Sequence, residues 1–101
     1  MKHLYLFLAL LHVLNIQAQQ TTEIDNLNNS AETLLNSDPR QAMQLAEKAH
    51  SSAQTEGYAN GMNRSTTITG IAQYKIDRYD KARIYFDEAI KSSTESPLIT
   101  V

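Results

Sequence analysis

The sequence predicts an all-α protein: two antiparallel helical hairpins, the start of an α-solenoid, that follow an N-terminal signal peptide. In the first eighteen residues, a short apolar run follows a basic start. Beyond it, apolar residues recur at helical spacing, with no alternating pattern of the kind that strands show. Sliding the chain along itself by 40 residues aligns Ala42 with Ala82 and Ala49 with Ala89. The second half of the chain therefore repeats the first.

Residues 1–18 have the layout of a secretory signal peptide. Lys2 gives a basic start, residues 4–14 are nearly all apolar, and Ala18 is the small residue before the expected cleavage site. A retained membrane anchor is the less favoured alternative, because a span needs about 20 apolar residues and His12 interrupts this run. We expect a mature chain that begins at Gln19, has no stable membrane span, and is periplasmic or secreted in a Gram-negative bacterium.

Composition excludes several classes of function for the mature chain. The formal charge of the 101-residue chain is −2 and becomes −3 without the leader, which carries one Lys and no acid. A mildly acidic domain is a poor nucleic-acid binder. The chain has no cysteine, and His50 is the only histidine beyond residue 18. We therefore expect no metal site, no cofactor and no catalytic residues, so that the protein is not an enzyme.

The first predicted repeat covers about residues 22–57. Its first helix follows from apolar residues at helical spacing, with Thr22 as the expected N-cap: Ile24, Leu27, Ala31, Leu34 and Leu35. This helix aligns with its counterpart in the second half only if one residue is deleted near Ser37, in the turn that follows the helix.

The second helix of this repeat has clear signals at both ends. Asp38 is a good N-cap, and Pro39 at the first helical position loses nothing by lacking an N–H group. Gly57 is a natural C-terminal cap. The helix should pack through its alanines, which include Ala42, Ala46 and Ala49.

The second predicted repeat covers about residues 58–94, with helices over 58–76 and 79–93. Asn60-Gly61 falls in the first turn of the earlier helix, and a start at Met62 is the alternative. Asp77 and Arg78 form the turn between the helices, since Asp tolerates a left-handed backbone better than most residues.

Small and aromatic residues alternate along this second hairpin at spacings that suit two closely pressed helices. They are Gly70, Tyr74, Tyr79, Ala82, Phe86, Ala89 and Ile90. The pattern resembles the tetratricopeptide repeat (TPR) consensus, strongly in the second repeat and weakly in the first. The period of 40 residues exceeds the roughly 34 that are usual for the family, as in long-period repeats of exported bacterial proteins.

The resemblance implies a protein-binding scaffold whose groove is lined by the first helix of each repeat. In the second repeat the corresponding residues are Arg64, Thr67, Ile71, Tyr74 and Lys75. In the first repeat they are Asp25, Asn28, Glu32, Leu35 and Asn36. The partner is then a protein or peptide, although Asn28 and Glu32 do not supply the clamp by which some relatives bind chaperone tails.

Residues 95–101 form a tail in which Ser96-Pro97 is typical of the first turn of a further helix. We interpret it as the start of a truncated third repeat. Because repeat arrays bury each hairpin against its neighbours, two repeats should leave apolar surface open. Self-association through the C-terminal end is the expected consequence.

A second class of function fits the same residues. Bacterial histidine kinases and transcription regulators with such repeats can begin with a signal sequence, so the chain is alternatively the N-terminal sensory input fragment of one. A transmembrane helix and a kinase or DNA-binding domain encoded directly downstream would identify it.

Overall fold

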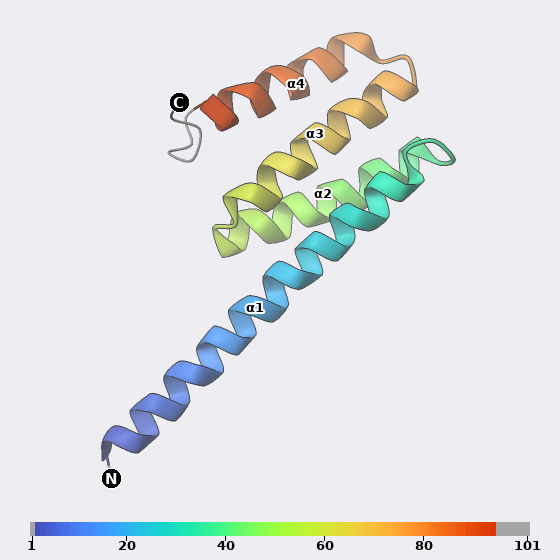
Figure 1. Ribbon diagram of the computed structural model, residues 1–101. Helices are drawn as coiled ribbons and strands as arrows, with labels where there is room; N and C mark the ends of the chain where they lie inside the picture. Colours follow the sequence, from blue (N-terminus) through green and yellow to red (C-terminus); the bar gives the residue numbers. More distant parts are fainter. Residues whose placement is uncertain (1, 95–101) are drawn as a thin grey trace.

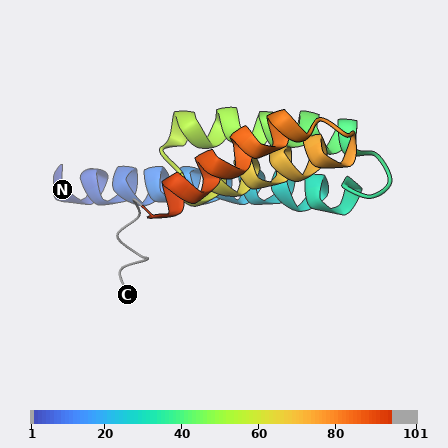
Figure 2. The same cartoon turned by 90° about the horizontal axis from the view of Figure 1, so that it is seen from above.

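The computed structural model describes the backbone of residues 2–94 and the side chains of residue 16 and residues 18–94. The predicted third repeat over 95–101 lies outside the described residues. The described part of the chain is all-α, as predicted, and consists of four helices and their short connections (Figure 1). They are α1 (Lys2–Leu34), α2 (Pro39–Glu56), α3 (Ala59–Lys75) and α4 (Tyr79–Thr94). Each helix packs against the next, and α1 also contacts α3. Seen from above, the helices lie alongside one another (Figure 2).

The first helix is longer than predicted. It begins at Lys2 and runs unbroken to Leu34, so Thr22 does not cap it. Instead the Thr22 hydroxyl donates a hydrogen bond to the carbonyl oxygen of Ala18, one turn earlier, at 2.8 Å. Such back-bonding lets a threonine sit inside a helix without ending it. The expected cleavage after Ala18 falls within this helix and stays a prediction.

The ends of α2 are confirmed residue by residue. The Asp38 carboxylate accepts a hydrogen bond from the Gln41 backbone N–H at 3.1 Å, and Pro39 opens the helix. At the other end Gly57 takes a left-handed conformation, with φ 67°, and its N–H bonds back into the last turn. Both caps satisfy backbone groups that the helix itself leaves free.

The helix α3 begins at Ala59, so Gly61 lies inside it and the alternative start at Met62 is wrong. A Cβ atom at Gly61 would lie 2.9 Å from a methyl group of Ile24 and 2.7 Å from the Tyr58 ring. The glycine is therefore needed where α1 crosses α3. The turn after α3 is confirmed as well, because Asp77 has φ 64°.

The core lies among α1, α2 and α3. One cluster of buried residues consists of Ala31, Leu35, Ala42, Ala46, Ile68 and Ala72. A second consists of Ile24, Ala49 and Ala53. The alanines of α2 are fully buried and let α2 approach both neighbours closely.

The helix α4 is attached to α3 by a close crossing. A Cβ atom at Gly70 would lie 2.7 Å from the Phe86 ring, so the ring packs on the bare backbone of α3. Ala82 and Ala89 are buried, as the spacing predicts. Tyr74, Tyr79 and Ile90, by contrast, are exposed. Small residues in the second hairpin thus lie where its two helices meet.

Candidate functional site

The predicted groove residues lie on the α1–α3 side of the molecule, and the structure brings only some of them together. Arg64 and Glu32 meet across the two helices. Thr67 and Ile71 are half-buried, and Ile71 also packs against the core. Tyr74 and Lys75 lie further along, at the end of α3, and are exposed.

Arg64 links α3 to α1 through two side chains. Its guanidinium donates to Glu32 from Nε at 3.1 Å, with an ion-pair contact of 2.9 Å, and to Asn29 Oδ1 at 2.6 Å. The hydrogen bond to Glu32 raises the pKa of Arg64. Both charged side chains remain partly exposed, so solvent weakens the pair and it fixes geometry more than it stabilises the fold.

Asn28 lies inside the contact between α1 and α3 and has no exposed surface. Its amide donates to the Gly61 carbonyl oxygen at 3.3 Å, and its Oδ1 is 3.0 Å from the Ser65 hydroxyl. A buried amide needs such partners. Asn28 therefore joins the helices, and the predicted groove does not include its side chain in this conformation.

Tyr58 adds a polar contact at the same helix pair. Its hydroxyl donates to the Asp25 carboxylate at 2.8 Å. This hydrogen bond, helped by partial burial, raises the pKa of Tyr58, because the bond is made by the protonated phenol. Asp25, a predicted groove residue, is thus already paired within the chain. The two remaining groove residues of the first repeat lie just after α1 and differ, since Leu35 is buried and Asn36 exposed.

Tyr74 and Tyr79 form an exposed aromatic pair where α3 ends and α4 begins. Their ring centres are 5.2 Å apart at an interplanar angle of 58°. The Tyr79 hydroxyl donates to Asp77 Oδ1 at 3.0 Å, which raises the pKa of Tyr79. Lys75 follows Tyr74 directly, so this corner combines aromatic surface with a positive charge.

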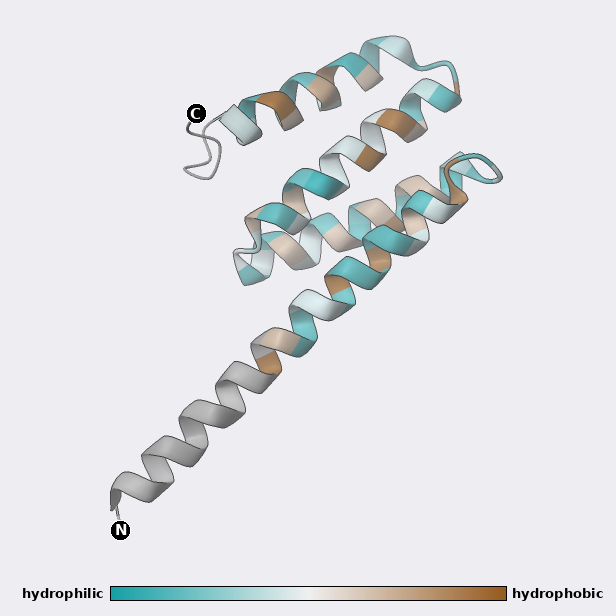
Figure 3. Ribbon diagram, in the orientation of Figure 1, coloured by the Kyte–Doolittle hydropathy of each residue, from teal (hydrophilic) through white to brown (hydrophobic). Residues whose placement is uncertain are grey.

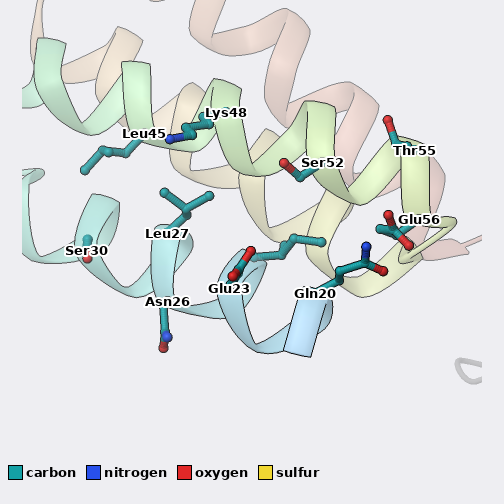
Figure 4. Close-up of a pocket in the computed structure, with 11 residues that line it drawn as sticks. Gln20, Glu23, Asn26, Leu27, Ser30, Leu45, Lys48, Ser52, Thr55 and Glu56 are labelled. Carbon is teal, nitrogen blue, oxygen red and sulfur yellow. The ribbon is translucent and has the colours of Figure 1, made fainter. Parts of the chain in front are cut away.

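A hollow of about 620 Å³ lies elsewhere, between α1 and α2 (Figure 4). Leu27 points from α1 towards α2, and Leu45 points from α2 towards α1. Glu23, Lys48 and Glu56 also line it. We call this the N-terminal hollow. The sequence did not predict this hollow, because Leu27 and Leu45 are apolar residues expected to pack inside the first hairpin, whereas the structure leaves both half-buried.

Two further hollows lie between α2 and α4, next to α3. The first, of about 270 Å³, is lined by residues that include His50, Thr66 and Thr69, and the second, of about 440 Å³, by residues that include Gln73 and Ile84. His50 is half-buried there. The Gln73 Oε1 atom is buried without a hydrogen-bond partner among the described residues.

Among the described side chains, those of residue 16 and residues 18–94, no group of three or more His, Asp or Glu is placed to hold a metal ion. In the same part of the chain, no helix combines the length and the apolar content that a membrane crossing requires.

Comparison of the chain with protein-family models, with curated proteins and with solved structures finds no match.

Proposed function

We propose that this chain is a non-catalytic scaffold that binds a protein or peptide, of the tetratricopeptide-repeat type. The observation that supports binding most directly is the exposed Tyr74–Tyr79 pair beside Lys75, continuous along α3 with half-buried Ile71. Tyrosines with a polar group and a nearby apolar residue are typical centres of protein interfaces.

Two features of the second hairpin support the repeat type. The Phe86 ring packs on Gly70, and Ala82 and Ala89 are buried. These are the positions at which the sequence pattern resembles the repeat consensus.

Site-specific photocrosslinking in cells tests the proposal, with the crosslinking residue at Tyr74 and a matched control at exposed Lys81 on the α2–α4 side. We expect a protein adduct from position 74 that position 81 does not give. The adduct is identified, and its affinity for the purified chain is then measured. Tyr74→Ala should weaken binding by about tenfold, whereas Lys81→Ala leaves it unchanged. Equal losses in both variants would place the site elsewhere.

We also propose that the chain is exported and loses residues 1–18. The basic start, the short apolar run and Ala18 support this. Intact mass of the chain from the periplasm or the medium should correspond to a start at Gln19. Chain that begins at Met1 and stays in the membrane fraction would contradict export.

A further inference from the structure

The two hairpins repeat one another in their contacts as well as in sequence. Gly70 of α3 lies under Phe86 of α4. The corresponding residues of the first hairpin, Ala31 and Ala46, belong to the same core cluster. Residues of α3 therefore correspond to residues of α1 that lie 39 positions earlier in the sequence, and residues of α4 correspond to residues of α2 that lie 40 positions earlier.

At the C-terminal side, side chains of the second hairpin are more exposed than the corresponding side chains of the first. Leu35 is 9% exposed because Ile68 and Ala72 of α3 share its cluster. Its counterpart Tyr74 is 58% exposed. His50 is half-buried, whereas its counterpart Ile90 is 62% exposed. We call Tyr74, Phe86 and Ile90 the C-terminal face; apolar positions on α4 are brown in Figure 3.

The N-terminal hollow is the matching gap at the other side. Thr66 and Thr69 of α3 are buried, in a region that α2 shares. Their counterparts in α1 are Leu27 and Ser30, which line the N-terminal hollow, and Ser30 is exposed. In the second hairpin, α2 covers this side of α3. The first hairpin has no corresponding helix to cover this side of α1.

We propose that the C-terminal face of one copy packs into the N-terminal hollow of a second copy, head to tail. The second copy is the occupant that the chain's own packing specifies, since α2 already packs beside α3 in this way. Within the chain, His50 and Thr69 line one hollow. Between copies, the corresponding neighbours are Ile90 of one and Ser30 of the next.

Charges favour the contact between copies over its counterpart within the chain. Glu47 and Glu88 line the same hollow inside one chain, and both are acidic. The corresponding positions between copies are Asp87 of one and Lys48 of the next, which carry opposite charges. Complementary charges fix the register of an interface. Ile90 would meanwhile meet the apolar surface that Leu27 provides.

A head-to-tail contact uses two different surfaces, so it generates rings or open chains of copies. A two-fold dimer through the C-terminal face would instead place Ile90 against Ile90. Cysteine crosslinking separates these arrangements, because the chain contains no cysteine of its own.

The experiment mixes full-length Ser30→Cys and Ile90→Cys chains, expressed from Met1 and identified by intact mass, with a short bifunctional maleimide. The matched control replaces Ile90→Cys by Ile84→Cys, since Ile84 is equally exposed on α4, at 65%, but lies on the α2–α4 side. We expect a mixed adduct from Ser30→Cys with Ile90→Cys that the control does not give. Self-adducts of Ile90→Cys alone, or equal yields with Ile84→Cys, would overturn the proposal.

Sedimentation velocity over a wide concentration range gives an independent readout. Association of the unmodified chain should weaken by about tenfold or more in Ile90→Asp, and change by less than about twofold in Ile84→Asp. A chain that stays monomeric throughout would overturn the proposal. Tyr74 belongs to both surfaces, so the two proposals are separated at Ile90, which is not a groove residue. Ile90→Asp should weaken self-association and leave partner affinity unchanged, so either proposal can fail without the other.

Discussion

The helices α3 and α4 are 17 and 16 residues long, but eight residues of α3 are buried and only two of α4. The difference arises from position, because α3 packs against α1, α2 and α4, whereas α4 packs on α3 alone among the helices of residues 2–94. Neither core cluster includes an α4 residue. A helix that is covered on one side opens more easily and offers its other side to partners.

The largest expected effect separates the three-helix core from the edge helix. Ala46 is fully buried among three helices, and Ala89 is 8% exposed against α3. We expect Ala46→Asp to lower the free energy of unfolding by about 3 to 5 kcal/mol, because the carboxylate has no partner. Ala89→Asp should cost about 1 to 3 kcal/mol, since the new side chain can turn towards water. Urea melts give both values, and equal losses would contradict the comparison.

A smaller difference should separate the two helix crossings. An alanine at Gly61 would press on Ile24, which is buried in the core. An alanine at Gly70 would press on Phe86, which is half-buried and can shift. We expect both changes to destabilise the fold by about 1 to 3 kcal/mol, with Gly61→Ala the more damaging. Thermal melts that rank them in the opposite order would show that α4 is held more rigidly than its burial indicates.

The smallest effect compares two tyrosines. Tyr58→Phe removes the bond to Asp25 between α3 and α1 and should cost about 1 kcal/mol at neutral pH. Tyr79→Phe removes a bond within one exposed turn and should change nothing measurable.

The pH dependence of this difference follows from the sign of the shift. The pKa of Tyr58 is higher in the folded state than its ordinary value of 10.0. Its contribution is therefore complete below pH 10 and is lost as the pH rises through the folded-state value. Urea melts of wild type and Tyr58→Phe should converge in that alkaline range. A difference that stays constant would remove the hydrogen bond as its cause.

Local signals were sufficient for three of the four helices. Asp38 and Pro39 began α2, Gly57 ended it, and Asp77 formed the turn before α4. The start of α1 was wrong because Thr22 satisfies its hydroxyl inside a helix as readily as at its end.

The site was harder to predict because the exposure and the partners of its residues depend on the orientation of α1 relative to α3. That orientation buries Asn28 and brings Arg64 to Glu32, and it pairs Tyr58 with Asp25. Helical spacing places residues on a face but does not say which neighbouring helix that face meets. The contacts between α1 and α3 join residues that are more than thirty positions apart in the sequence, so no local pattern indicates them.

Hydrogen exchange of the full chain tests the contrast between the covered helices and the edge helix most directly. It is measured by mass spectrometry at the lowest workable concentration, where a second copy does not cover α4. Backbone amides of α4 should exchange faster than those of α2 and α3, because α4 can detach while the three-helix core stays folded. Equal protection of α3 and α4 would mean that the described helices unfold as one unit, and would contradict the account of α4 as an uncovered edge.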